Sequence, residues 1–402
     1  MMRAGTVLHV LEAFAGGTER HLLDLVRHVE GYDHVLAVPS RHHGRSTAGA
    51  VRRAELAGAR VEIVEMGRAG AGAPNLAALV RLRRLIDRLA PDLVHGHSSI
   101  GGALARVAAA PVEVPVLYTP HGLSRSRWAL GVERLLGGRA ERLIAVSASE
   151  RNFALRHGIA RAERIVVIPN GLELRPPAPP VRGLRERLGI PDGVPLVGCC
   201  ARLAWQKAPE VYVAAAALAA RELPAAHFVL VGSGPLRQAV ERAIARAGLA
   251  PRFHLLSGLD DAAASMGELD AYVLPSRFEG GPYTPLEAMR AGVPVVVTDV
   301  DGNRDTVAHG RSGLIVPAED PTALAHAMIA VLRDAALSER LVRGAREELP
   351  RFDVRRMARM TARVYAELLA GRGLGAGEVD LRVRTRAGGP REQASALDPS
   401  LR

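Results

Sequence analysis

The chain has 402 residues, and its 53 basic side chains outnumber 42 acidic ones, which gives a formal charge of +11. All but one of the basic residues are arginines, an imbalance typical of an arginine-favouring coding bias, and the single lysine is Lys207. An apolar content of 48% excludes a disordered chain, and two adjacent cysteines, Cys199 and Cys200, exclude a disulfide framework.

The amino-terminal segment predicts a first β-strand rather than a signal peptide. The apolar run of residues 1–14 is interrupted by Glu12 and lacks a small-residue cleavage site. No uncharged run reaches the ~18 apolar residues that a membrane span requires. The two cysteines lie in an apolar run and are typical of buried core residues in a reducing compartment. We therefore expect a cytoplasmic protein without a membrane-spanning helix.

Strand-like and helix-like segments alternate from the start of the chain to about residue 171. Short β-branched runs are followed by longer Ala-, Leu- and Arg-rich segments of helical period, such as Asn75–Leu89 and Ser149–His157. This alternation predicts a parallel, doubly wound sheet. The predicted strands are Thr6–Val10, His34–Pro39, Val61–Val64, Asp92–His95, Val116–Thr119, Arg142–Val146 and Ile165–Ile168.

A proline-rich segment at residues 172–183 interrupts this alternation. Its four prolines cannot continue a helix or a central strand, so the segment predicts a linker. It would join two Rossmann-like domains, residues 1–171 and residues 184–371. Residues 372–402 are rich in Gly, Arg and Pro without any periodicity, which predicts a disordered tail.

After the linker the alternation restarts, and a helical stretch at Pro321–Leu369 follows the last predicted strand. Charge is divided unevenly: residues 1–180 carry a net +8, residues 181–371 a net +1 and the tail a net +2. The first half is therefore the basic one. The predicted strands of the second half are Val194–Cys200, His227–Val231, Phe253–Leu256, Ala271–Leu274, Pro294–Thr298 and Leu314–Val316.

Two cations, Arg202 and Lys207, follow the first predicted strand of the second half. In doubly wound folds, ligands bind where the carboxyl ends of strands meet the following loops, so both cations lie at the correct edge. An arginine fork with an ammonium five residues later suits a diphosphate leaving group. An ordinary charged loop is the alternative interpretation.

A glycine-rich turn, VGSGP, contains Gly232 and Gly234 and precedes the predicted helix Leu236–Ala247. Glycines permit close approach of the backbone to a phosphate or a base, and a helix amino terminus favours anions. Many strand–helix turns carry Gly-x-Gly merely to turn, so this motif alone is a weak indicator.

The strongest feature is a pair of carboxylates, Glu279 and Glu287, on either side of a helix that is predicted to begin near Thr284. They can accept hydrogen bonds from hydroxyls of two different sugars. The main-chain N–H groups of Tyr283 and Thr284 would meanwhile point at a phosphate. The alternatives are a solvated loop acid for Glu279 and a helix-surface acid for Glu287.

The order of these motifs resembles that of the retaining glycosyltransferases of family 4, which have the GT-B fold. In the second half the resemblance rests on Arg-x4-Lys, VGSGP and Glu-x7-Glu within EGGPYTPLEAMRAGVPVV, followed by GNRDTVAHGRSGLIVP. In the first half, GGTERHLLDLV, DLVHGHS, TPHGL, IAVS and VIPNGL match in order and spacing. The resemblance covers about residues 5–370. It implies an α/β protein of two Rossmann-like, doubly wound domains that face a cleft, with carboxyl-terminal helices.

The resemblance also implies a role for each matching residue. His121 would face the donor sugar near its anomeric carbon. Glu279 would accept hydrogen bonds from the sugar hydroxyls, and Glu287 from the ribose of the nucleotide. Arg202 and Lys207 would hold the diphosphate and stabilise its departing charge. Tyr283, Thr284 and glycines of three loops would complete the donor site; these glycines are Gly16, Gly17, Gly232, Gly234 and Gly281.

The implied reaction is metal-independent transfer with retention at the anomeric carbon. Fixed cations and a helix amino terminus stabilise the departing diphosphate, and the leaving phosphate helps to take the acceptor proton. The implied substrates are a nucleotide sugar, UDP-sugar favoured over GDP-sugar, and a glycan or lipid-linked acceptor of bacterial surface polysaccharide, with no cofactor. The chain departs from the family pattern at Ala208, where glycine is frequent, and at Pro282, which lacks an N–H group for phosphate.

Two other motifs suggest metal binding less strongly. Asp299-Val-Asp301 spells the DxD metal site of another glycosyltransferase class, but it lies in a turn after a predicted strand. His95 and His97 could begin a metal site, but no third ligand is suggested nearby. We expect neither motif to bind metal, and we expect His97 to lie near the acceptor. Trp205 suits loop packing and a platform for the base equally well.

Three rival functions remain. A GT-B nucleotide-sugar epimerase would use the same donor, and a pyridoxal-phosphate phosphorylase would need Lys207 as its lysine. A nucleic-acid-binding protein is suggested only by the +11 charge. The 14 aromatic residues of the chain are scattered rather than interleaved with basic residues, so we expect no nucleic-acid partner.

The basic first half predicts a contact with the acceptor or with an anionic membrane. Candidate segments are Arg52-Arg53 and Arg81–Arg88, the latter an amphipathic helix with a basic face. A solvated helix face is an equally good interpretation. Our hypothesis is a peripheral enzyme on the cytoplasmic face of the inner membrane that extends a lipid-linked glycan.

Overall fold

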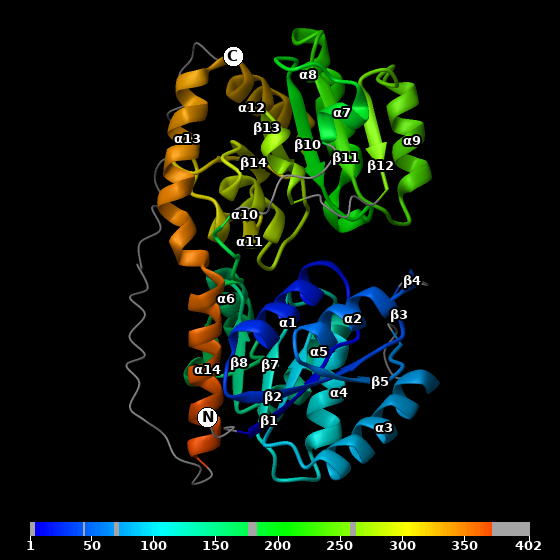
Figure 1. Cartoon of the computed structure of the whole chain (residues 1–402), viewed down its shortest axis with the longest axis vertical. Helices are drawn as coiled ribbons and strands as arrows, with labels where there is room; N and C mark the ends of the chain where they lie inside the picture. Colours follow the sequence, from blue (N-terminus) through cyan, green and yellow to red (C-terminus); the bar gives the residue numbers. More distant parts are fainter. Residues whose placement is uncertain (1–4, 43–44, 68–71, 176–182, 258–262, 372–402) are drawn as a thin grey trace.

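The computed structural model describes residues 5–42, 45–67, 72–175, 183–257 and 263–371. Most of the expected linker and all of the expected disordered tail lie outside these ranges. The described residues form two α/β domains, one above the other in Figure 1, each built on a parallel sheet. The predicted α/β architecture is confirmed.

The first domain contains a seven-stranded parallel sheet in the order β5-β2-β1-β6-β7-β8-β9. All seven predicted strands are present, and the largest differences are of two residues: β2 begins at Tyr32 and β6 continues to His97. A two-stranded antiparallel hairpin of β3 (Arg41–His42) and β4 (Arg45–Ser46) lies outside the sheet. The sheet strands are β1 (Gly5–Val10), β2 (Tyr32–Val38), β5 (Arg60–Ile63), β6 (Leu93–His97), β7 (Val116–Thr119), β8 (Arg142–Ala145) and β9 (Ile165–Val167).

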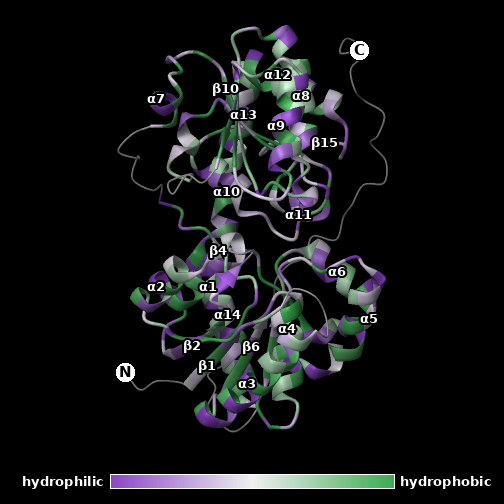
Figure 2. Cartoon of the chain, turned by 90° about the vertical axis from the view of Figure 1, so that its right-hand side faces the viewer, coloured by the Kyte–Doolittle hydropathy of each residue, from purple (hydrophilic) through white to green (hydrophobic). Residues whose placement is uncertain are grey.

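Helices follow these strands and cover the sheet. Their buried faces carry Leu, Val and Ala, and the strands are hydrophobic through the centre of the domain (Figure 2). Burial of this apolar surface is the main force that holds helices against the sheet. The helices are α1 (Gly16–His28), α2 (Ala48–Leu56), α3 (Ala73–Leu89), α4 (Ser99–Ala109), α5 (Arg127–Leu136) and α6 (Ala148–Arg156).

The second domain contains a six-stranded parallel sheet in the order β12-β11-β10-β13-β14-β15. Four of its six strands have the predicted bounds. The strands are β10 (Leu196–Cys200), β11 (His227–Val231), β12 (Phe253–Leu256), β13 (Ala271–Leu274), β14 (Val295–Thr298) and β15 (Leu314–Val316). The accompanying helices are α7 (Leu184–Leu188), α8 (Pro209–Glu222), α9 (Arg237–Arg246), α10 (Tyr283–Arg290) and α11 (Asp301–Thr306).

The predicted helical stretch after β15 is divided into α12 (Pro321–Arg333), α13 (Ala335–Glu348) and α14 (Val354–Ala370). Asp334 ends α12 and caps α13, and Asp353 caps α14 through its carboxylate. The expected boundaries assigned the last helix to the second domain. The structure packs it against the first domain instead. Figure 1 shows α13 beside the second domain and α14 beside the first.

The apolar face of α14 is buried against the first sheet. Val354, Met357 and Val364 are at most 2% exposed and share one cluster with Val7 of β1 and Leu117 of β7. The hydroxyl of Tyr365, also on α14, lies 2.8 Å from Nδ1 of His95 on β6. The first domain is therefore completed by residues from the carboxyl-terminal end of the described chain.

The chain crosses between the domains at two places that are hydrogen-bonded to each other. The main-chain N–H of Leu172 donates to the oxygen of Phe352 at 2.7 Å, and that of Val354 donates to the oxygen of Leu172 at 3.0 Å. Gly171 permits this approach, because a Cβ there would lie 2.5 Å from Cα of Val354. The two crossing segments thus form one paired connection.

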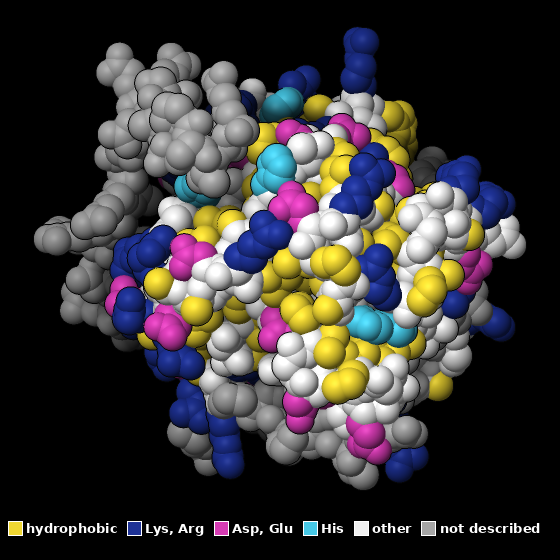
Figure 3. All heavy atoms as spheres, turned by 90° about the horizontal axis from the view of Figure 1, so that it is seen from above, with side chains coloured by type: hydrophobic (Ala, Val, Ile, Leu, Met, Phe, Trp, Pro, Cys, Tyr) yellow, Lys and Arg dark blue, Asp and Glu magenta, His cyan; other side chains and the backbone are white. Residues whose placement is uncertain are grey.

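Charge on the second domain is mixed. Figure 3 looks onto this end of the molecule, where arginine and acidic side chains are interspersed among apolar ones. This agrees with the small net charge of residues 181–371. Among the described helices, none is long and apolar enough to cross a membrane.

Candidate active site

The carboxyl-terminal edges of the two sheets face each other, and loops from both edges are in contact. Nδ2 of Asn170 donates to the main-chain oxygen of Gly281 at 2.7 Å. Arg125 pairs with Asp301 at 2.6 Å. The main-chain N–H of Ser149 donates to the carboxylate of Asp305, on α11, at 2.9 Å. These contacts place the expected catalytic residues of both domains along one interface.

Lys207 and Glu279 form an ion pair at the centre of the second domain's edge. Lys207 follows β10 and Glu279 follows the adjacent strand β13, and Nζ lies 2.5 Å from Oε1. The hydroxyl of Ser276 also lies 2.5 Å from that oxygen. The Glu279 side chain is 5% exposed, whereas that of Lys207 is 20% exposed. Parallel strands that lie side by side therefore bring together two residues 72 positions apart.

The Arg202 loop packs on the glycine-rich turn after β11. A Cβ at Gly232 would lie 1.9 Å from the oxygen of Ala201, and a Cβ at Gly234 would lie 2.3 Å from that of Leu203. Close packing of the two backbones therefore requires both glycines, whether or not a ligand also approaches them. Arg202 itself is exposed, on the loop that ends at Lys207.

Glu287 pairs with a residue of the opposite domain that sequence reasoning missed. Its carboxylate contacts the guanidinium of Arg20, which lies on α1. Burial raises the pKa of Glu287, and Arg20 opposes that shift. The same guanidinium lies 5.0 Å from the centre of the Tyr283 ring. The charge of Glu287, the residue expected to bind the ribose, is thus balanced by Arg20 of the opposite domain.

The first turn of α10 faces the first turn of α1. Pro282 precedes the helix, and the first two N–H groups belong to Tyr283 and Thr284. A Cβ at Gly17 would lie 3.3 Å from the Tyr283 ring, so the glycine permits this contact. In the described part of the chain, the buried Tyr283 hydroxyl has no hydrogen-bond partner. Gly16 adopts a φ of +62°, which favours glycine, at the start of α1.

His121 lies where the first domain meets the Glu279 loop. A Cβ at Gly280 would lie 3.1 Å from the main-chain carbon of His121, so these two loops touch. The residue has a φ of +58°, uncommon for a side chain other than glycine. Its Nε2 lies 3.2 Å from Nδ1 of His97, and its ring centre 4.5 Å from that of His21. The structure therefore brings His97, His121 and Glu279 to one region.

His21 is a further member of this region. Nδ1 of His21 lies 3.1 Å from Oδ1 of Asn170, and the ring is 2% exposed. Burial lowers the pKa of His21 to about 4. The imidazole is therefore neutral at physiological pH.

A small pocket opens at the same interface, between Gly122 and Ser149 of the first domain and Phe278 and Asp301 of the second. Glu150 also lines it and accepts hydrogen bonds from the N–H groups of Gly122 at 2.6 Å and Val146 at 2.8 Å. Burial raises the pKa of Glu150 to about 7. This carboxyl group holds the turn that carries His121.

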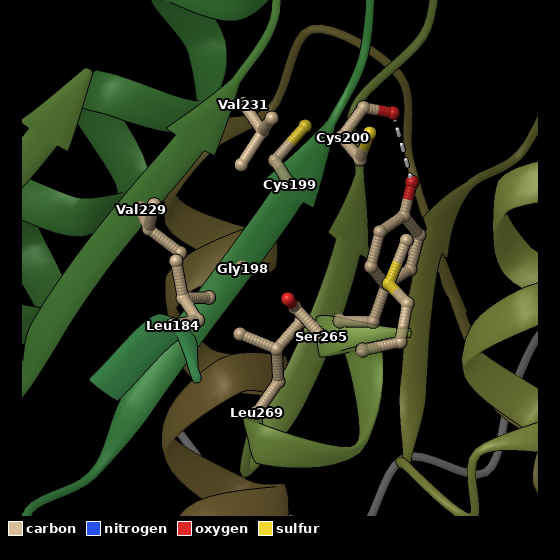
Figure 4. Close-up of a pocket in the computed structure, with 10 residues that line it drawn as sticks. Leu184, Gly198, Cys199, Cys200, Val229, Val231, Ser265 and Leu269 are labelled. Carbon is tan, nitrogen blue, oxygen red and sulfur yellow. Dashed lines mark hydrogen bonds between the residues drawn. The ribbon is translucent and has the colours of Figure 1, made fainter. Parts of the chain in front are cut away.

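A second pocket lies inside the second domain, below the edge of the sheet (Figure 4). It is lined by Cys199, Cys200, Leu269 and other apolar side chains, with the hydroxyl of Ser265 unpartnered within the described chain. Burial raises the pKa of Cys200 to about 12, so its thiol is not reactive. Cys199 is a core residue, as predicted, and Cys200 is partly buried against the core.

The two motifs that suggested metal binding have other partners. The carboxylate of Asp299 pairs with Arg304, and that of Asp301 with Arg125. His95 and His97 do have a third histidine nearby, contrary to the sequence interpretation, because His9 on β1 lies opposite His95 in register. Trp205 is 64% exposed, and the guanidinium of Arg277 lies 5.0 Å from the centre of its ring, which supports loop packing.

Four residues of the region were not singled out from the sequence. Arg20 and His21 lie in GGTERHLLDLV and Asn170 in VIPNGL, so two of the matching segments contained them. Glu150 had no signal beyond a buried position near the start of a helix. Their partners are in other segments of the chain, which is why spacing could not identify them.

We expect the chain to lose stability as the pH falls from about 6.5 towards 4. The pKa of His21 is about 4 in the fold and 6.5 in the unfolded chain. His21 therefore adds one proton to the unfolded chain in this window, and this contribution lowers the free energy of unfolding by on the order of 3 kcal/mol at the acid end. Urea unfolding across this pH range measures the effect. His21→Asn, which keeps a donor for Asn170 but does not titrate, should give a shallower slope.

His326 is an exposed histidine on α12 and serves as the control. His326→Asn should leave the pH dependence of unfolding unchanged. Equal slopes for the original protein and for His21→Asn would contradict the assignment.

Comparisons with known proteins agree with this arrangement. The model of "Glycosyltransferase Family 4" matches residues 15–175, and that of "Glycosyl transferases group 1" matches residues 182–348. A D-inositol 3-phosphate glycosyltransferase of Frankia alni is 31% identical over 305 residues, which are 69% of this chain and 75% of the relative. The Escherichia coli UDP-Gal:alpha-D-GlcNAc-diphosphoundecaprenol alpha-1,3-galactosyltransferase is 29% identical over 279 residues, 66% of this chain and 72% of that protein.

The fold has solved counterparts. The crystal structure of Anabaena Alr3699/HepE in complex with UDP and glucose has a TM-score of 0.79 and 21% identity, and covers 90% of this chain and 100% of that chain. The two parallel-sheet domains, their facing edges and the matches along both halves lead to one conclusion. The chain belongs to the family 4 glycosyltransferases and has their GT-B fold.

Proposed function

We propose that this glycosyltransferase moves a sugar from a nucleotide diphosphate sugar, with retention at the anomeric carbon, to a glycan or lipid-linked acceptor. A UDP-sugar is favoured over a GDP-sugar. The observation that carries the proposal is the Lys207–Glu279 pair, held 2.5 Å apart at the sheet edge that faces His121. A fixed ammonium and a carboxylate at this position are the groups that a diphosphate and a sugar hydroxyl require.

The diphosphate would be bound by cations and by the start of α10. Lys207 and Arg202 lie on the loop after β10, and the N–H groups of Tyr283 and Thr284 open α10. Negative charge grows on the diphosphate as the glycosidic bond breaks, and these groups stabilise it where it develops. The chemistry needs neither a metal ion nor an organic cofactor.

The two carboxylates would change partners when the donor binds. Glu279 now accepts from Lys207 and Ser276, and Glu287 contacts Arg20. With the donor bound, Glu279 would accept from hydroxyls of the sugar while Lys207 turns to the phosphate. Glu287 would accept from the ribose. Lys207 would exchange a carboxylate for a phosphate, and each carboxylate would exchange a cation for hydroxyl donors, so each of these groups stays hydrogen-bonded, which limits the cost of burial.

Retention follows from the direction of attack. A double displacement requires a carboxylate nucleophile beside the anomeric carbon. Glu279 is the carboxylate expected nearest the sugar, and we assign it to hydrogen bonds with the sugar hydroxyls rather than to attack on the anomeric carbon. We infer that the acceptor hydroxyl attacks on the same face as the leaving diphosphate. The departing phosphate oxygen takes the proton of that hydroxyl.

The acceptor side is proposed to be the basic first domain, in bacterial surface-polysaccharide synthesis on the cytoplasmic face of the membrane. The E. coli relative is a galactosyltransferase whose name specifies a diphosphoundecaprenol-linked acceptor. On α3, Leu76 and Val80 are 59% and 52% exposed, and Arg81 and Arg84 are exposed beside them. Exposed apolar and basic side chains on one helix suit an anionic membrane surface.

A nucleotide-sugar epimerase of the same fold is the second candidate. It would use the same donor contacts but no acceptor. Release of free nucleotide that depends on an added acceptor excludes it. Nucleic acid is not proposed as a partner, because aromatic side chains are not gathered with the basic ones.

Glu279→Ala should reduce sugar transfer by at least about 100-fold, because the sugar loses its carboxylate partner. Binding of the nucleoside diphosphate, measured by thermal shift, should persist because Lys207 and Arg202 remain. A panel of nucleotide sugars, assayed for slow hydrolysis, first identifies the donor. Glu210→Ala, on the exposed face of α8, is the control and should retain activity. Full activity of Glu279→Ala would remove the proposed site.

Lys207→Arg should lower kcat/KM by about tenfold, although the charge is kept. The ammonium packs within 2.5 Å of Glu279, and a planar guanidinium cannot occupy the same volume. Arg246→Lys, an exposed exchange on α9, is the matched control. If Lys207→Arg is as active as the original protein, the only lysine reflects composition rather than chemistry.

The double variant Arg81→Ala/Arg84→Ala should bind phosphatidylglycerol vesicles about fivefold more weakly for each arginine removed. Sedimentation with these vesicles, and with neutral phosphatidylcholine vesicles, measures the difference. Arg242→Ala/Arg246→Ala removes two exposed arginines from the second domain and should have no effect. Binding that is insensitive both to salt and to the α3 substitutions would refute an electrostatic contact.

A further inference from the structure

Four buried imidazoles form a hydrogen-bonded chain that ends at His121. Nε2 of His34 lies 3.1 Å from the main-chain oxygen of Val29, and Nδ1 of His34 lies 2.9 Å from Nε2 of His9. Nδ1 of His9 lies 3.0 Å from Nε2 of His97, and Nδ1 of His97 lies 3.2 Å from Nε2 of His121. The chain therefore leads from β2 through β1 and β6 to the active site.

The carbonyl group at the far end determines where every proton lies. A carbonyl oxygen only accepts, so Nε2 of His34 must carry the proton and its Nδ1 must accept. His9 then donates from Nε2 and accepts at Nδ1, and His97 does the same. The last donor is Nε2 of His121. All four rings are consequently the same tautomer.

The chain requires neutral rings. A second proton on His34, His9 or His97 would place two donors against each other at one of the links. On His121 it would go to Nδ1, outside the links, and there burial opposes it by lowering the pKa of the ring. Burial lowers the pKa of each ring. His9 and His97 are 0% exposed and His34 is 6% exposed, whereas His121 is partly exposed at the interface.

We propose that the chain His34–His9–His97 fixes His121 as the Nε2–H tautomer, so that its Nδ1 is an acceptor for a hydroxyl group of the bound sugar. The inference rests on the proposed function and adds to it the direction of the hydrogen bond: the ligand donates and His121 accepts. His34, His9 and His97 are positioning residues, because they act through His121.

His21 has the opposite tautomer for a similar reason. Nδ2 of Asn170 donates to the oxygen of Gly281, so Oδ1 of Asn170 faces Nδ1 of His21 and must accept from it. Nε2 of His21 is therefore unprotonated. Its ring is 4.5 Å from that of His121, centre to centre. Two neighbouring imidazoles thus present lone pairs, and a polyhydroxy ligand supplies the matching donors.

A transition metal is the competing occupant of this histidine cluster. Two sets of three rings have nitrogens close enough to share an ion: His9, His95 and His97, and His21, His97 and His121. Both nitrogens of His95 are already engaged, with Tyr365 and Thr119 at 2.8 Å each. Both nitrogens of His9 and of His97 are engaged within the chain. Hydrogen bonding therefore accounts for all six nitrogens of the first set without a metal. In the second set, Nδ1 of His121 and Nε2 of His21 are the nitrogens that the proposal assigns to sugar hydroxyls, and the metal measurement below tests the alternative.

Long-range ¹H–¹⁵N correlation spectra of the ¹⁵N-labelled full chain test the tautomers directly. We expect Nε2–H for His34, His9, His97 and His121, and Nδ1–H for His21, each assigned from the signal lost in a single variant. Nδ1–H at His121 overturns the proposal. So does a stoichiometric metal in the purified protein whose removal by chelation changes these signals. This measurement needs no substrate, so it stands or fails separately from the proposed function.

Two substitutions at His34 connect the tautomer to catalysis. His34→Leu removes the acceptor for His9, and we expect mixed tautomers at His121 and a kcat/KM about tenfold lower, as for loss of one hydrogen bond. His34→Asn, whose Oδ1 can replace Nδ1, should restore both. His254→Leu removes a ring from the second domain and should leave transfer unchanged. Equal activity of the Leu and Asn variants, with equal melting temperatures, would show a merely structural role.

Discussion

The packing of α14 against the first sheet is the contact on which the geometry of the active site depends. It buries Val354, Met357 and Val364 among strands to which they are not adjacent in sequence. With the connection at Leu172, it anchors the end of the second domain's chain on the first domain. The two sheets can then present their carboxyl-terminal edges to each other, and the residues of the site come from the strand ends, loops and helix starts at these edges. An apolar contact outside the site thus holds the two edges together, along with the direct contact between the loops of His121 and Glu279.

Electrostatic balance is the second theme of the site. Glu279 has Lys207, Glu287 has Arg20 and Asp301 has Arg125, and two of these three pairs join one domain to the other. Buried or half-buried charges of this kind are stable only with partners. The neutral histidines nearby follow the same rule in another way, since burial keeps them uncharged and hydrogen bonding fixes their protons. The region therefore holds many polar groups at a limited electrostatic cost.

The sequence was sufficient to predict the local structure and the part of the site that the second domain contributes. Strands such as His227–Val231 and Val116–Thr119 are short apolar runs between clear breaks, and their predicted bounds are correct. Lys207 and Glu279 could be found because each follows a strand. The destination of α14 could not be predicted, because its apolar face would fit either sheet. Arg20, His9 and His34 were missed for a related reason: their importance lies in partners that other strands supply, and no local pattern records a partner.

The paired crossing at Leu172 and Asp353 has a mechanical consequence. Two bodies joined by adjacent, hydrogen-bonded segments can rotate about the line through that joint, whereas sliding would break the pairing. Contacts far from the joint then separate most for a given rotation, and contacts beside it hardly move. Ligand entry and exit would therefore be a matter of angle rather than of translation. The pairing of Leu172 with Asp353 would be the hinge of this rotation.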